Sequence, residues 1–111
     1  MKSKILIAGQ EGMVGSSLYK LLKKKGLNII ECKRKDIDFT NQSSVNNWFK
    51  KFRPEIVINA AGKVGGIMDN KKFQSDYIYI NSMIGLNIIN SSLKYNVKKL
   101  VNLGSACIYP K

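Results

Sequence analysis

The chain has 111 residues, a length that suits one domain with a single core and excludes two substantial domains. Hydrophobic residues make up 44% and charged residues 23%, a balance that excludes disordered and fibrous proteins. The 19 Lys and Arg outnumber the 7 Asp and Glu, for a net charge of +12, but the cations form small clusters along the whole chain. We therefore expect solvated helix ends and no nucleic-acid partner.

The apolar runs and the cysteines exclude further classes of protein. No run approaches the roughly 18 residues of a membrane-spanning helix, and residues 5–8 are too few for the core of a signal peptide. We expect a cytoplasmic protein that contacts no membrane. Cys32 and Cys107 have no partners at metal-ligand spacing and histidine is absent, so we expect no metal site.

The first predicted elements are a strand at residues 5–8 and a helix that ends near Gly26. The strand is a short apolar run, and a glycine is typical of the position just beyond a helix. The apolar side chains of the helix recur at helical spacing, so we expect them to pack on the sheet. They are Val14, Leu18, Leu21 and Leu22.

A second strand and a second helix follow. Residues 27–32 form the apolar strand, a polar segment comes next, and Pro54 ends the helix. The apolar stripe of this helix consists of Val45, Trp48, Phe49 and Phe52.

The same pattern then occurs a third time. Residues 55–59 form a strand, a glycine-rich loop leads to a long helix at about 75–95, and residues 99–103 form a fourth strand. One face of the long helix carries Ile80, Ile84 and Ile88. Strands that alternate with helices predict an α/β domain, with about four strands in one parallel sheet and three helices covering both faces.

The junction between the first strand and the first helix has a G-x-x-G-x-x-G spacing. Gly9 would make the tight turn, Gly12 would let the backbone approach a pyrophosphate, and Gly15 would let the helix pack closely on the strand. The N-terminus of the helix adds N–H groups and a positive dipole end. This context predicts a Rossmann-type dinucleotide-binding domain over residues 1–111. The candidate contacts are Gly9, Gln10, Glu11, Gly12, Met13, Val14 and Gly15.

The end of the second strand bears on which dinucleotide binds. A carboxylate there bonds the ribose 2′-hydroxyl of NAD, whereas arginine accommodates the 2′-phosphate of NADP. Lys33, Arg34 and Lys35 favour NADP, with Arg34 the best candidate because its planar fork can grip a phosphate. Glu31 would favour NAD instead if it, and not Lys33, marks the end of the strand.

Two further loops carry more specific motifs. Residues 59–67 read Asn-Ala-Ala-Gly-Lys-Val-Gly-Gly-Ile, and residues 103–111 read Leu-Gly-Ser-Ala-Cys-Ile-Tyr-Pro-Lys. Together with the glycine loop they resemble the GDP-L-fucose synthase family of extended short-chain dehydrogenase-reductases, and the resemblance covers essentially the whole chain. It implies cofactor contacts at the ends of the third and fourth strands. These are Asn59, Ala60, Ala61, Gly62, Leu103 and Gly104.

The resemblance also implies a reaction of GDP-fucose biosynthesis. The family acts as an isomerase and an oxidoreductase on GDP-4-keto-6-deoxy-mannose, epimerising C3 and C5 and then reducing the C4 ketone with NADPH. Ser105 would bond the ketone oxygen, and Cys107 would be an acid and base of the epimerisation. Without the flanking motif, Ser105 is typical of a loop hydroxyl and Cys107 of a small buried residue.

The match is to the N-terminal, NADP-binding portion of such an enzyme. The family's Tyr-x-x-x-Lys pair and C-terminal substrate domain follow the serine in chain order, so we expect this chain alone to be inactive. For the full-length protein the resemblance implies a homodimer and a nucleotide-sugar substrate. Glu11 departs from the basic residue expected near the adenosine phosphate. The open alternatives are another nucleotide-sugar epimerase, dehydratase or reductase, and a non-catalytic dinucleotide-binding module.

Overall fold

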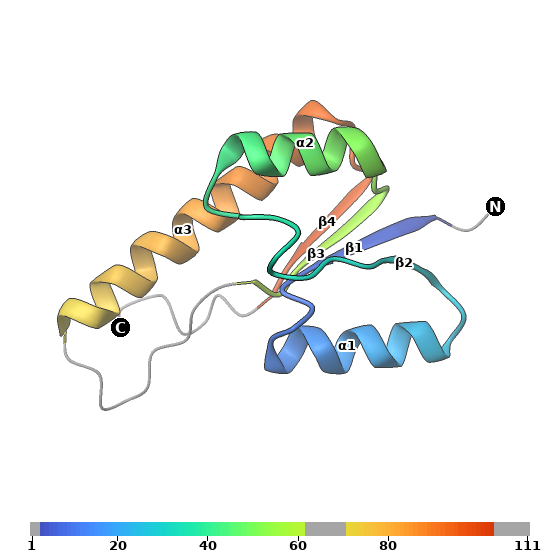
Figure 1. The fold of residues 1–111 in the computed structure, drawn as a ribbon, viewed down its shortest axis with the longest axis horizontal. Helices are drawn as coiled ribbons and strands as arrows, with labels where there is room; N and C mark the ends of the chain where they lie inside the picture. Colours follow the sequence, from blue (N-terminus) through green and yellow to red (C-terminus); the bar gives the residue numbers. More distant parts are fainter. Residues whose placement is uncertain (1–2, 62–70, 104–111) are drawn as a thin grey trace.

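A computed structural model describes residues 3–61 and 71–103, with the side chains of residues 71–77 left out. In these ranges three helices and four parallel strands alternate along the chain (Figure 1). In order they are β1 (Lys4–Ala8), α1 (Met13–Lys24), β2 (Asn28–Ile30), α2 (Gln42–Phe52), β3 (Ile56–Asn59), α3 (Lys71–Lys94) and β4 (Lys99–Asn102). The predicted α/β fold with a Rossmann-type parallel sheet is confirmed.

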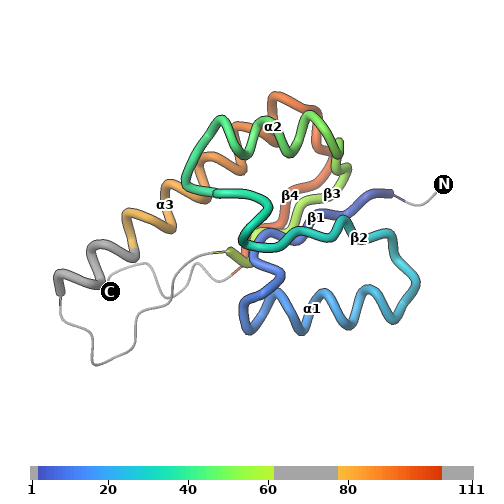
Figure 2. Tube along the Cα trace, in the orientation of Figure 1, coloured from blue at the N-terminus to red at the C-terminus, as the bar shows by residue number. Residues whose placement is uncertain are grey.

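The strand order β2-β1-β3-β4 decides where the helices lie. From β1 the chain crosses through α1 to β2 on one side, and α2 then carries it back past β1 to β3 on the other side. Because such crossovers are right-handed, opposite directions of travel place the helices on opposite faces. Figures 1 and 2 show α1 on one face of the sheet and α2 with α3 on the other, as predicted.

The central strand β1 divides the core into two layers. Leu6 points toward α2 and α3, where it packs with Val45, Phe49 and Ile88. Ile7 packs on the opposite face, where Leu18, Tyr19 and Leu22 of α1 cover it. Both β1 side chains are fully buried, as expected for a parallel strand covered on both faces.

Only half of the apolar side chains predicted to pack α1 on the sheet do so. Leu18 and Leu22 pack on the sheet, but Val14 and Leu21 are 58% and 51% exposed. The buried Gly15 sets the face of the helix that meets the sheet, and the residues three, four and seven positions later complete it. Val14 and Leu21 therefore flank the contact instead of forming it.

Two predicted boundaries also shift. The strand predicted to reach residue 32 ends at Ile30, because the side chain of Gln10 bonds both the Ile30 carbonyl and the Cys32 N–H. The third helix begins at Lys71, earlier than the predicted residue 75. The end of α2 before Pro54 is confirmed, and Arg53 closes it in the left-handed conformation with φ 49°. Within the described ranges, no helix combines the length and the apolar character needed to cross a membrane.

Candidate functional site

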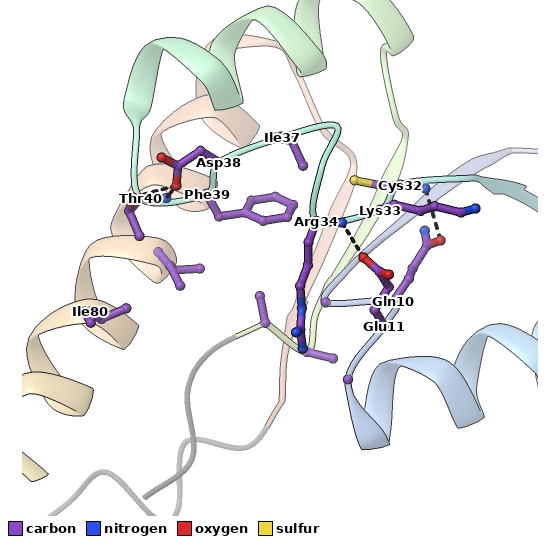
Figure 3. A pocket seen from close by; sticks show the side chains of 15 residues that line it. Gln10, Glu11, Cys32, Lys33, Arg34, Ile37, Asp38, Phe39, Thr40 and Ile80 are labelled. Atoms are coloured by element: carbon purple, nitrogen blue, oxygen red, sulfur yellow. Dashed lines mark hydrogen bonds between the residues drawn. The ribbon is translucent and has the colours of Figure 1, made fainter. Parts of the chain in front are cut away.

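A pocket of about 620 Å³ opens at the carboxyl ends of β1 and β3. The connections after these neighbouring strands lead to opposite faces of the sheet, and open α/β sheets bind ligands at such a point. Its wall combines the loop after β1, the segment after β2, the end of β3 and one face of α3 (Figure 3). The lining residues are Gly9, Gln10, Glu11, Gly12, Cys32, Lys33, Arg34, Ile37, Asp38, Phe39, Thr40, Ala60, Ala61, Ile80 and Ile84.

The three glycines after β1 face different surroundings. Gly9 has φ +87°, and a Cβ there would lie 2.7 Å from the Ala60 carbonyl oxygen. A Cβ on Gly15 would overlap the carbonyl oxygen of Gly9, so α1 can approach the loop only through a glycine. A Cβ on Gly12 would meet only the Gly9 oxygen at 3.4 Å. Gly9 and Gly15 are therefore required by the fold, whereas Gly12 leaves bare backbone at the pocket wall.

The N-terminus of α1 adjoins this bare backbone. Gly12 is the N-cap residue, no side chain caps the helix, and its first turn contains no acidic residue. Unpaired N–H groups and the positive end of the helix dipole favour a negatively charged group at such a position. This part of the pocket is suited to a phosphate.

Gln10 fastens the glycine loop to β2. Its Nε2 donates to the Ile30 carbonyl at 2.6 Å, and its Oε1 accepts from the Cys32 N–H at 3.1 Å. The residue is only 8% exposed, so both groups of its amide are used for structure. Gln10, predicted as a cofactor contact, lines the pocket, and both groups of its side-chain amide hold the end of β2.

Charged side chains gather where the chain leaves β2. The carboxylate of Glu11 accepts a hydrogen bond from the backbone N–H of Arg34. Lys33 Nζ lies 3.7 Å from a carboxylate oxygen of Glu31, and Asp36 accepts from the Lys33 N–H at 3.0 Å. Figure 3 shows the Arg34 side chain extending into the pocket and that of Lys33 extending away from it.

Cys32 is a buried thiol beside this charged group. Burial, and to a smaller extent the charges of Asp36 and Glu11, raise its pKa from 9.0 to about 12. A thiol with such a pKa stays protonated at neutral pH and is a poor nucleophile. Cys32 is therefore a packed residue of the pocket wall.

The part of the pocket wall formed by the end of the segment after β2 and by α3 is apolar, and the sequence analysis did not predict it. Ile37 and Phe39 follow β2 in the segment predicted only as polar, and Ile80 faces them from α3. Asn87 of α3 donates to the Phe39 carbonyl at 2.9 Å and thereby anchors the segment. Two apolar residues alternate with charged ones in this polar stretch, and that alternation was the sequence pattern that could have predicted the apolar wall.

The predicted site residues fall into three groups. Gly9, Gln10, Glu11, Gly12, Lys33, Arg34, Ala60 and Ala61 line the pocket. Met13, Val14, Gly15, Asn59 and Leu103 lie near it but outside its lining. Gly62, Gly104, Ser105 and Cys107 lie outside the described residues. Within the described part of the chain, no three His, Cys, Asp or Glu residues gather as a metal site would require.

Asn59 has a structural partner instead of a place in the pocket. Its Nδ2 donates to Oδ1 of Asn102 at 3.0 Å, and its Oδ1 accepts from the Ala61 N–H at 3.0 Å. The Leu103 N–H donates to the Asn59 carbonyl. These bonds fix the carboxyl ends of β3 and β4 relative to each other, and hence the points at which the loops beyond them begin.

Comparisons with known proteins agree with this geometry. Residues 5–111 match the model of the NAD dependent epimerase/dehydratase family. A GDP-L-fucose synthase of Arabidopsis thaliana is 42% identical over 98% of the chain. A GDP-D-glycero-L-gluco-heptose synthase from Campylobacter jejuni, solved in the presence of NADPH, is 40% identical over 99% of the chain with a TM-score of 0.88. A GDP-mannoheptose C4 reductase from the same organism, with NADP bound, is 40% identical over 91% with a TM-score of 0.83.

The chain covers only a small share of each relative's own length. The chain spans 34% of the plant synthase and 32% of each of the two bacterial structures. The similarity therefore concerns about one third of each of those proteins.

Proposed function

Because the chain belongs to the NAD dependent epimerase/dehydratase family, we propose that its pocket binds a nicotinamide dinucleotide, NADP in preference to NAD. The observation that carries the proposal is the contrast among the three glycines of the loop, since of these Gly12 alone has room for a Cβ, at the N-terminus of a helix that no described side chain caps. The pyrophosphate would lie on Gly12 and the first turn of α1. A pocket of about 620 Å³ is within the range of cofactor sites.

The segment after β2 would hold the adenosine end. Arg34, which extends into the pocket, would grip the 2′-phosphate with its planar guanidinium. Lys33, which pairs with Glu31, would add further positive charge. The apolar wall at Ile37 and Ile80 offers a surface for a flat adenine ring. When bound, NADPH would supply the hydride.

We propose further that the chain is the N-terminal, cofactor-binding portion of a GDP-L-fucose synthase-like enzyme. The support is the 42% identity to a GDP-L-fucose synthase, together with the loop motifs at residues 59–67 and 103–111. The substrate would then be GDP-4-keto-6-deoxy-mannose. A second candidate is a GDP-heptose reductase or synthase, because solved structures named for GDP-heptoses are equally similar, at 40% identity.

Two residues of the last loop would carry the chemistry. Ser105 would donate a hydrogen bond to the C4 ketone oxygen, which stabilises the negative charge that develops there in both stages of the reaction. Cys107 would remove a proton from the carbon next to the ketone, forming an enolate, and reprotonation on the other face would invert that carbon. This proton transfer must precede reduction, because the ketone is what makes the neighbouring protons acidic.

These roles predict that mutation separates the two stages. In the full protein that carries this chain, Cys107→Ser should abolish deuterium uptake from solvent at C3 and C5, because a hydroxyl is a far weaker acid than a thiol. Reduction of a keto sugar supplied already epimerised should largely survive. Ser105→Ala should slow both stages about 100-fold or more. NMR of the sugar and the consumption of NADPH measure the two stages.

Intact deuterium uptake in the Cys107→Ser variant would contradict the role of the thiol. Turnover of a GDP-heptose ketone in preference to the fucose precursor would favour the second candidate. Ser43→Ala is a suitable control, since this residue of α2 is exposed and does not line the pocket.

We also propose that the full protein is a homodimer, and α3 supplies the support. Its outer face exposes Tyr79, Leu86 and Leu93, which are 67%, 65% and 76% exposed and follow one another at seven-residue spacing. A second copy would cover this stripe in the manner of paired helices.

A further inference from the structure

The carboxylates of this chain are concentrated at the adenosine end of the pocket. The chain has 7 acidic residues against 19 basic ones, yet four of the seven lie in or beside this corner. Glu11 and Asp38 line the pocket, while Glu31 and Asp36 bond Lys33. A site that selects strongly for the extra phosphate of NADP would be expected to concentrate positive charge there.

Glu11 is the carboxylate that changes the local balance. Residues 31–36 carry two acidic and three basic side chains, and Glu11 brings a third negative charge from the other loop, so the formal charge of Glu11 and residues 31–36 together is zero. Its presence close to the end of β2 is also apparent at Cys32, where the Glu11 charge raises the pKa of the thiol. Among the described residues, Arg34 is the one that donates a hydrogen bond to Glu11.

We infer that Glu11 determines how strongly this pocket discriminates between NADP and NAD, and that it keeps the discrimination weak. The inference rests on the proposed function, because it assumes that the 2′ position of the bound ribose lies beside Arg34. One oxygen of Glu11 is used by the Arg34 N–H. The other can accept a hydrogen bond from a ribose hydroxyl, as an acidic residue near the end of the second strand does in NAD-binding domains.

The two charged side chains act in opposite directions on a 2′-phosphate. Arg34 attracts it through charge-assisted hydrogen bonds. Glu11 repels it, since both groups are negative and the pocket wall screens them less than water does. A 2′-hydroxyl is uncharged, so it loses the attraction of Arg34 but is not repelled by Glu11. It can also donate a hydrogen bond to the Glu11 carboxylate. The ratio of the two affinities therefore depends on both side chains.

Glu11→Gln separates the charge of this residue from its structural role. The amide oxygen of glutamine can still accept the Arg34 N–H, so the loop should keep its conformation while the negative charge is lost. Glu31→Gln is the matched control, because Glu31 directly follows the end of β2 and yet pairs with Lys33 and does not line the pocket. Arg34→Ala removes the opposing positive charge.

The experiment measures dissociation constants for NADPH and NADH, and for 2′,5′-ADP and 5′-AMP as adenosine-end probes, in the full protein that carries this chain. The wild type should prefer the 2′-phosphorylated member of each pair by less than about tenfold, because the two charges oppose each other. Glu11→Gln should raise both preferences about tenfold, and Glu31→Gln less than twofold. Arg34→Ala should remove the preference.

The possible failures are distinguishable. Wild-type protein that binds neither dinucleotide would overturn the proposed function and this inference with it. Binding of both with a preference above about 1,000-fold would overturn the inference alone, whether or not the variants fold, because Glu11 would then not oppose the phosphate. An unchanged ratio in Glu11→Gln, or an equal rise in Glu31→Gln, would likewise overturn it and leave dinucleotide binding intact.

Discussion

The two walls of the pocket are built on different principles. The wall after β1 is formed by backbone. Its shape is fixed by close packing, because Gly9 lies against Ala60 and Gly15 lies against Gly9, with no room for a Cβ at either glycine. The wall after β2 carries charged side chains beside the apolar Ile37 and Phe39, and Glu11 reaches it from the facing loop. Gly9 and Gly15 of the first wall cannot change without loss of the fold. The charged side chains of the second wall can change without such a loss, and the proposed choice between NADP and NAD rests on them.

The largest effect should come from comparing two glycines of the first wall. Gly15→Ala should lower the free energy of unfolding by about 3–5 kcal/mol or prevent folding, because its Cβ would overlap the Gly9 carbonyl oxygen. Gly12→Ala should cost only about 1 kcal/mol, as an unfavourable N-cap residue. It should nonetheless weaken NADPH binding about tenfold or more, because the methyl group occupies the surface a pyrophosphate approaches.

Chemical denaturation and nucleotide titration of both variants measure these effects. Equal losses of stability in Gly12→Ala and Gly15→Ala would mean that both glycines serve the fold alone. Unchanged NADPH affinity in Gly12→Ala would place the pyrophosphate elsewhere.

A smaller effect should follow from loosening the connection between the two walls. Gln10→Leu leaves the Ile30 carbonyl and the Cys32 N–H without their buried partner, so it should lower the free energy of unfolding by about 2–4 kcal/mol. Because the end of β2 then loses its anchor, NADPH affinity should fall as well. Urea denaturation and titration would show this, and a stability loss no larger than that of the exposed-site variant Ser43→Ala would argue against the connection.

The smallest effect concerns the thiol between the walls. Cys32 has a pKa of about 12 in the folded chain against an ordinary value of 9.0, so above pH 9 the unfolded chain releases a proton that the folded chain keeps. The stabilisation is complete below pH 9 and declines between pH 9 and 12, reaching a loss of at most about 1.4 kcal/mol by pH 10. Cys32→Ala should make the free energy of unfolding fall less steeply over this range. Parallel slopes would indicate an accessible thiol.

The features that the sequence predicted depend on local patterns, and the features that it missed depend on contacts between distant positions. The strands, the helices and the glycine loop depend on local periodicity and on steric demands that a few residues express, so they were predicted to within a few positions. The exposure of Val14 and Leu21 was missed, because the face of α1 is set by the contact of Gly15 with the loop. The meeting of Glu11 with Arg34 and the pairing of Asn59 with Asn102 join positions far apart in the chain. Neither pairing has a local pattern that would reveal it.

The contact of Gly9 with Ala60 has a consequence for the order of events during synthesis. The turn at Gly9 is synthesised well before Ala60, the backbone that it rests against, because the whole stretch from α1 to β3 lies between them. Parallel pairing of β1 with β3 closes this long interval, and such non-local contacts form slowly. The nascent loop therefore has no fixed shape until β3 has docked, so the proposed nucleotide site can form only with that event.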